Sequence, residues 1–175
     1  MHQINRADAA AFVGMLGGVF EHSPWVAERA WPARPFADLE ALHASMTLAV
    51  LTAERELQLA LIRAHPELAG REAEQGVLSA DSSSEQGRLG FSALPGAEMA
   101  ALHELNRRYR AKFGFPCIIA LRLHAERDSV LAEFARRLEN GRESEISNAL
   151  AQIGHIARGR LEKLIEDGKT DHPRP

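Results

Sequence analysis

The 175-residue sequence has little of what several protein classes need. It holds one cysteine, Cys117, which excludes an intramolecular disulfide and a cysteine-cluster metal site. Its 21 Lys and Arg residues stand against 24 Asp and Glu residues, and the net charge of −3 gives no positive field for nucleic acid or an anionic membrane. The longest apolar stretch, Ala9–Phe20, has 12 residues, well short of the roughly 20 of a transmembrane helix. We therefore expect no nucleic-acid or membrane partner, and a reducing, cytoplasmic compartment.

Metal and cofactor motifs are also missing. The eight histidines include no H-E-x-x-H pattern and no pair three or four positions apart on a predicted helix. Gly14, Gly17 and Gly18 lie within a predicted helix rather than between a strand and a helix, which excludes a phosphate-binding loop. We expect neither a metal ion nor an organic cofactor.

What the sequence does contain is helical periodicity. Apolar residues recur at three- and four-residue spacing along most of the chain, and a hydrophobic content of 45% suffices for a sizeable core. The first predicted helix has Asn5 as its N-cap and extends to Phe20, and a second, short helix begins at Ser23-Pro24. Further helices are predicted over Asp38–Ala64, Ser79–Phe91, Gly96–Phe113, Asp128–Asn140 and Glu143–Glu166. The sequence thus predicts a compact, single-domain, all-α bundle of about seven or eight helices over residues 1–166, followed by a polar tail at 167–175.

One run of residues is typical of a β-strand, the five residues Cys117, Ile118, Ile119, Ala120 and Leu121. A single short strand cannot form a stable sheet. We therefore expect an extended or irregular segment that the helices bury.

His65 precedes Pro66, which disfavours helical dihedrals in the residue before it, so the long helix must end there. The partial negative charge of a helix C-terminus favours a protonated imidazole, which would suit a proton donor at neutral pH. A packing or capping histidine is the alternative, and this position by itself does not decide between them.

The segment from Ser82 to Gln86 also has two interpretations. Ser82 and Glu85 match the S-x-x-E capping box, in which both side chains satisfy the first N–H groups of a helix. Alternatively, the hydroxyls of Ser82, Ser83 and Ser84 face a cavity and, with Glu85 and Gln86, bind a small polar ligand. Both interpretations can hold together.

Arg160 lies on the apolar face of the last predicted helix. At 100 degrees per residue it shares a stripe with Ile146, Leu150, Ile153, Ala157 and Leu164, whereas Arg158 lies roughly 160 degrees away. We expect Arg160 to point inward and Arg158 outward. An inward guanidinium needs an anion, which is either an internal carboxylate or the carboxylate of a substrate.

Taken together, these motifs resemble one family in order and spacing. They are His65-Pro66-Glu67-Leu68-Ala69-Gly70, Ser82-x-x-Glu85-Gln86 with Gly90, Phe113-Gly114-Phe115-Pro116, Arg137-x-x-Asn140, and the pattern from Glu145 to Arg160-Leu161. The chain resembles the 2-oxo-4-hydroxy-4-carboxy-5-ureidoimidazoline (OHCU) decarboxylases, which catalyse the last step of urate breakdown to (S)-allantoin. The similarity runs from about Asn5 to Leu164.

The resemblance implies an all-α fold, commonly a homodimer, that acts on OHCU without a metal or organic cofactor. It implies that His65 is the catalytic histidine, Glu85 its partner and Arg160 the substrate-binding arginine. The substrate-contacting positions that it implies are Pro66, Ser82, Ser83, Ser84, Glu85, Gln86, Cys117, Ile118, Ile119, Ala120, Leu121 and Arg160. Two positions depart from the family pattern: Cys117 stands where Phe is frequent, and Leu89 stands where a small residue is usual.

Two other functions stay open. In the first, the chain is a non-catalytic helical interaction module in which His65 and Glu85 cap helices and Arg160 forms a structural salt bridge. In the second, the fold is kept but acts on a related ureido or imidazole carboxylate, an alternative that Cys117 keeps open.

Overall fold

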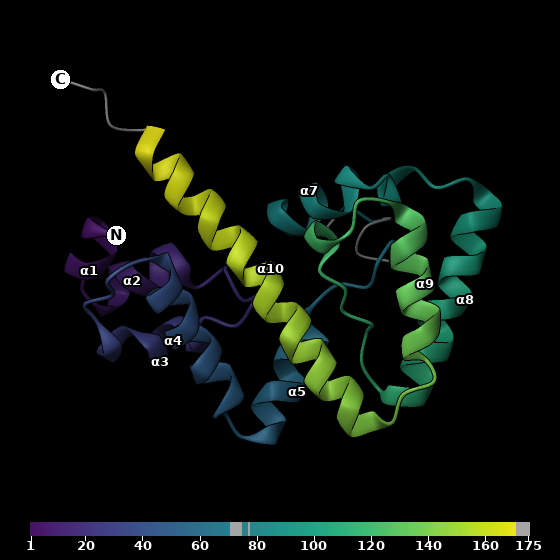
Figure 1. The fold of residues 1–175 in the computed structure, drawn as a ribbon, viewed down its shortest axis with the longest axis horizontal. Coiled ribbons are helices and arrows are strands. Elements are labelled where there is room, and N and C mark those ends of the chain that lie inside the picture. Colours follow the sequence, from purple (N-terminus) through teal and green to yellow (C-terminus); the bar gives the residue numbers. More distant parts are fainter. Residues whose placement is uncertain (71–74, 77, 171–175) are drawn as a thin grey trace. The chain divides into compact units, whose positions relative to one another are not determined.

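The computed structural model describes residues 1–70, 75–76 and 78–170 (Figure 1). Its α-helices are α1 (His2–Arg6), α2 (Ala9–Leu16), α3 (Trp25–Ala30), α4 (Leu39–Leu51), α5 (Arg55–Ala64), α7 (Ala80–Arg88), α8 (Gly96–Phe113), α9 (Arg127–Arg137) and α10 (Arg142–Thr170). Short 3₁₀ helices cover Trp31–Ala33 (η1), Phe91–Ala93 (η2) and Leu121–Leu123 (η3). Since the described residues include no strand, the predicted all-α class is confirmed.

No described helix is long and apolar enough to cross a membrane. The last helix runs to Thr170, beyond the expected start of the tail, and residues 171–175 of that predicted tail lie outside the described residues.

The chain folds into two compact units. Unit 1 comprises residues 1–61 and the part of α10 from Gly154 onward, and unit 2 comprises residues 62–153. The boundaries therefore fall inside α5 and inside α10. One domain over residues 1–166 stays a prediction.

In unit 1, aspartates cap the helices where side-chain oxygens can reach the first free N–H groups. Asp8 accepts a hydrogen bond from Ala11 N at 2.8 Å, and Asp38 accepts one from Ala41 N at 2.8 Å. The expectation that Asn5 is the first N-cap is wrong. Its amide is occupied by the Phe36 backbone instead.

The single helix predicted over Asp38–Ala64 is two helices, α4 and α5. Side chains satisfy the carbonyl groups at the end of α4: the Thr52 hydroxyl donates to a carbonyl one turn back at 2.8 Å. Gln58 Nε2 donates to the Val50 carbonyl at 3.0 Å and to the Leu51 carbonyl at 3.2 Å. These bonds pair the Leu48, Val50 and Leu51 carbonyls at the point where the chain turns out of α4. Apolar periodicity alone gives no sign of such a break.

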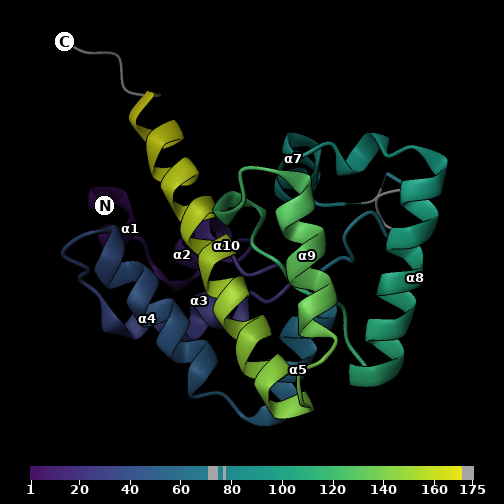
Figure 2. The same ribbon diagram turned by 45° about the vertical axis from the view of Figure 1, so that its right-hand side comes forward.

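The later part of α10 packs against α4 within unit 1, and Figure 2 shows the two helices side by side. His43 on α4 bonds through Nε2 to the Gly154 carbonyl at 2.8 Å, and Arg158 on α10 contacts the Glu40 carboxylate. The core of this unit is apolar and includes Phe12, Leu16, Phe20, Val26, Leu42, Met46, Ala157 and Leu161, all fully or nearly fully buried.

The core of unit 2 is aromatic. Tyr109 on α8 has its ring centroid 4.5 Å from that of Phe113, 6.1 Å from that of Phe115 and 5.6 Å from that of Phe134 on α9. Gly114 ends α8 with φ +79°, a left-handed conformation that glycine adopts without strain. The predicted end of this helix is confirmed.

Candidate functional site

His65 directly follows α5 in unit 2. The helix ends at Ala64, as the following Pro66 predicts, and the His65 N–H donates to the Ile62 carbonyl at 3.3 Å. The His65 side chain is buried, and its Nε2 atom is shielded from solvent. The surroundings of the imidazole are therefore protein atoms rather than bulk water.

Gln86 on α7 holds the loop that follows His65. Its Oε1 accepts a hydrogen bond from the Ala69 N–H at 2.8 Å, and its Nε2 donates to the Glu67 carbonyl at 3.2 Å. One side-chain amide thus pairs with the chain on both sides of Leu68, as a peptide group of a neighbouring β-strand would. Gln86, predicted to contact substrate, is committed to the backbone of this loop.

Helix α8 contacts the same loop. Asn106 Nδ2 donates to the Leu68 carbonyl at 2.9 Å, and His103 Nε2 bonds to the Ala69 carbonyl at 3.1 Å. Arg110 Nε donates to the Glu67 carboxylate at 2.7 Å. His103, Asn106 and Arg110 lie three and four positions apart, which places them on one face of the helix. Sequence reasoning missed all three.

Ser79, not Ser82, is the N-cap of α7. Its side-chain oxygen accepts from the Ser82 N–H at 3.2 Å, so Ser82 and Glu85 lie inside the helix. The capping-box interpretation of Ser82 and Glu85 is therefore wrong, because the helix begins one turn earlier than that box requires. The predicted start of this helix at Ser79 is confirmed.

The predicted ligand-contacting residues of α7 differ in exposure. Ser82 and Gln86, one helical turn apart, are buried, and Glu85 beside them is half-buried. Ser83 and Ser84 are exposed. The face that carries Ser82, Glu85 and Gln86 is therefore the one turned to the protein interior, and substrate contact by Ser83 and Ser84 stays a prediction.

Residues 117–120 form no helix or strand, Leu121 begins η3, and all five residues are buried, as predicted. Arg137 Nη1 donates to the Ile118 carbonyl, and the Ala120 N–H donates to Gln152 Oε1 at 2.7 Å. Arg88 on α7 donates to the Leu121 carbonyl. These three backbone groups are engaged within unit 2, and ligand contact by residues 117–121 stays a prediction. Burial raises the pKa of the Cys117 thiol to about 12.

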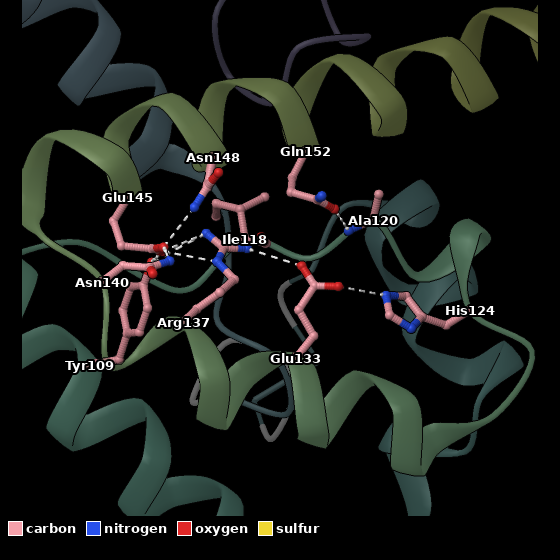
Figure 3. A network of polar contacts seen from close by, with 10 residues as sticks. All are labelled: Tyr109, Ile118, Ala120, His124, Glu133, Arg137, Asn140, Glu145, Asn148 and Gln152. Atoms are coloured by element: carbon pink, nitrogen blue, oxygen red, sulfur yellow. Dashed lines mark hydrogen bonds and ion pairs between the residues drawn. The ribbon is translucent and has the colours of Figure 1, made fainter.

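A buried polar network supports this segment (Figure 3). Arg137 and Glu145 are almost fully buried and form an ion pair, with Nη2 and Oε2 2.8 Å apart. Glu145 also accepts hydrogen bonds from Tyr109, from Asn140 Nδ2 at 2.6 Å and from Asn148 Nδ2 at 2.8 Å. Burial acts to raise the pKa of Glu145, but the hydrogen bonds from Arg137 and these neighbours outweigh it and lower that pKa.

The network continues toward η3. Glu133 on α9 lies 3.8 Å from Arg137 Nη1 through one carboxylate oxygen and 3.3 Å from His124 Nε2 through the other (Figure 3). The Arg137-x-x-Asn140 and Glu145 pattern seen in the sequence is thus structural: it joins α9 and α10 to the Ile118 carbonyl.

Arg160 lies in unit 1 and points inward, as its helical position predicts, whereas Arg158 is half-buried and pairs with Glu162 at 2.8 Å. Arg160 Nη1 is 2.7 Å from Glu21 Oε2, and both side chains are buried. The same nitrogen lies 3.5 Å from the Val19 carbonyl. Of the two partners considered for the guanidinium, the structure contains the internal carboxylate. Glu21, a charged residue directly after the apolar stretch Ala9–Phe20, was not predicted.

A family model describing OHCU decarboxylase matches residues 5–162. The chain belongs to the OHCU decarboxylase family. It is 38% identical over 165 residues to the OHCU decarboxylase of Mus musculus, covering 94% of this chain and 92% of that protein. It is 37% identical over 161 residues to the OHCU decarboxylase of Haloferax volcanii, covering 92% and 93%.

Longer proteins of the family contain a matching region as one part. The chain is 41% identical over 175 residues to the uric acid degradation bifunctional protein PucL of Bacillus subtilis, covering 99% of this chain and 34% of that protein. A crystal structure of (S)-allantoin synthase matches with a TM-score of 0.72 and 28% identity, covering 93% of this chain and 53% of the solved one. The chain thus spans about half of that solved structure and about a third of the bifunctional protein.

Proposed function

We propose that the protein is a cofactor-independent decarboxylase that converts OHCU to (S)-allantoin in urate degradation. Family membership over residues 5–162 carries this proposal, because relatives named for this activity align over more than nine tenths of both chains. The buried His65 and the firmly held loop behind it agree with a site that handles a proton away from bulk water.

The substrate supplies its own electron sink. Its carboxylate is attached to a ring carbon next to a C=N bond, so breaking the C–COO⁻ bond releases CO2 and pushes the electron pair into the conjugated system. The enol-like intermediate then needs one proton at the neighbouring carbon. The protein has to bind the carboxylate form, exclude water and deliver that proton to one face.

His65 is the proton-transfer residue in this proposal, and Glu85 orients the imidazole or fixes its protonation state. Delivery from one side gives a single allantoin enantiomer. Protonation by water after release of the intermediate would give a racemate. The optical purity of the product therefore reports whether the proton arrives within the site.

Arg160 binds polar edges of the substrate in this proposal. A guanidinium has five N–H donors in a fixed plane, so one arginine can serve both a protein carboxylate such as Glu21 and a substrate oxygen. Pairing with Glu21 holds the guanidinium in one orientation before substrate arrives. Backbone groups of residues 117–121 and the side chains of Pro66 and Ser82 complete the proposed contacts.

Two further parts of the proposal concern the state of the protein. We expect a homodimer, as the family resemblance implies, and a reducing, cytoplasmic location, which a single buried free thiol at Cys117 tolerates. A related ureido or imidazole carboxylate as substrate remains the second candidate, because Cys117 lies in the segment proposed to contact the ligand.

Circular dichroism of freshly generated urate-oxidation product tests the function. Urate oxidase and hydroxyisourate hydrolase would supply OHCU, with or without this protein. We expect the (S)-allantoin signal to appear rapidly with wild-type protein and to be lost in His65→Gln, which should fold normally. Unchanged slow decay in the presence of folded wild-type protein would refute the proposed function.

A further inference from the structure

The loop after His65 is held mainly through its backbone, with one further ion pair between the Glu67 side chain and Arg110. Gln86 from α7 pairs with the Glu67 carbonyl and the Ala69 N–H, while α8 supplies bonds to the Leu68 and Ala69 carbonyls. Four polar groups of three consecutive residues are thus fixed from two helices. Loops usually leave such groups to water, whereas side chains of the protein pair with them here.

Backbone conformation shows why the loop needs this support. Ala69 has φ +47°, in the left-handed region that is unfavourable for a residue with a Cβ. The bonds to the N–H and carbonyl of Ala69 oppose its relaxation to a commoner conformation. Ala69 lies four residues after His65, in the loop that continues from it.

Asn106 is the most informative of the loop's partners. It is buried, with only 5% of its surface exposed, and its Nδ2 donates to the Leu68 carbonyl at 2.9 Å. Its Oδ1 is buried and has no hydrogen-bond partner among the residues that the structure describes. A buried unpaired amide oxygen lowers stability. An asparagine at this position therefore does not serve stability alone, and its one bond goes to the loop behind His65.

We propose that Asn106 and His103 are positioning residues that act through residues 67–69 to hold His65 in its productive orientation. This inference rests on the proposed decarboxylase function. In this proposal neither residue contacts the substrate. Both act on the position of the His65 imidazole, and a displacement of about 1 Å in a reacting group can lower the rate about a hundredfold.

The test compares Asn106→Leu with a matched control in the other unit. Leu has the same number and branching of side-chain heavy atoms as Asn, although its methyl groups are bulkier, and it cannot donate to the Leu68 carbonyl. Asn5→Leu is the control, since Asn5 Nδ2 also donates to a backbone carbonyl, that of Phe36, at 2.9 Å. Thermal unfolding and far-ultraviolet circular dichroism establish the folded fraction of each variant before kinetics are measured.

We expect Asn106→Leu to lower kcat by at least about tenfold with KM within about twofold of wild type, since ground-state binding is left in place. The fraction of racemic allantoin should rise, because a displaced imidazole allows water to protonate the intermediate. Asn5→Leu should keep wild-type kcat and optical purity. Wild-type kcat and purity in folded Asn106→Leu would overturn the inference.

His103 gives a second, independent variant if Asn106→Leu does not fold. His103→Leu removes the bond to the Ala69 carbonyl, and His103→Gln keeps a side-chain N–H donor of similar reach. If kcat and the optical purity of allantoin fall in His103→Leu and recover in His103→Gln, the result would support the proposed positioning role of His103. Equal kcat in the two variants would overturn that role. If the wild-type protein itself fails to accelerate OHCU decay, the proposed function fails instead.

Discussion

Glu21 and Arg160 form an ion pair with both side chains buried, and Arg160 Nη1 lies 2.7 Å from Glu21 Oε2. The two residues are 139 positions apart in sequence. The pair joins the turn after α2 to the later part of α10 within unit 1. Arg160 therefore has a structural partner as well as its proposed role toward substrate, and substitutions can separate the two.

Glu21→Gln should lower the free energy of unfolding by about 3–5 kcal/mol, the usual loss when one member of a buried pair is removed and its partner stays charged. The double variant Glu21→Leu with Arg160→Met should regain much of that loss, because no charge remains buried. Urea unfolding measures both.

The double variant also separates stability from catalysis. If Arg160 binds substrate, the double variant should stay folded yet turn over OHCU much more slowly, with kcat/KM reduced by about a hundredfold or more for a lost charged contact. A stable double variant with wild-type kcat/KM would show that Arg160 is structural only.

Sequence reasoning succeeded where the cause is local. Pro66 ends α5 and Gly114 ends α8, because each acts on its own backbone or that of its neighbour. Arg160 was placed inward correctly because helical periodicity fixes the direction of a side chain. The all-α class follows from the same periodicity.

The partners of these residues were not predicted, since they depend on tertiary contacts. Gln86 pairs with a backbone 17 residues away, and Asn106 with one 38 residues away. An amide side chain in a helix gives no sequence signal of which carbonyl it will meet. The break after α4 was missed for the same reason, because its carbonyls are satisfied by Gln58 from the following helix.

Glu145 should make stability depend on acid pH. Its pKa is lowered in the folded protein, so its contribution is present above the ordinary glutamate pKa of about 4.3 and is lost as pH falls through the lower folded value. Glu145→Gln should be less stable than wild type at pH 7, and the difference should shrink below about pH 4. Urea unfolding from pH 7 to pH 3 checks this, and a difference that is constant with pH would contradict it.

Cys117 should be an inert thiol in the folded protein. Its pKa is raised to about 12 by burial, whereas an exposed thiol titrates near about 8.5. Labelling by iodoacetamide at pH 8 should therefore be slow in native protein and fast in urea. The raised pKa also predicts that stability falls as pH rises above about 8.5, because the unfolded state loses its thiol proton first. Rapid native labelling would show that the segment opens.

Glu85→Gln should lower kcat without a matching loss of stability. Glu85 is half-buried on α7, next to the Gln86 side chain that holds the loop behind His65. The amide keeps the size of the carboxylate but removes its charge, so it cannot fix the protonation state of His65. General acid–base transfer contributes about 100-fold to 10,000-fold to a rate, which sets the largest loss of kcat expected. The pH dependence of kcat should also change, since the role proposed for Glu85 is to orient the His65 imidazole or to fix its protonation state. Glu104→Gln is the matched control, because Glu104 is an exposed carboxylate paired with Arg107 on α8. Equal kcat and pH profiles for the two variants would remove Glu85 from the mechanism.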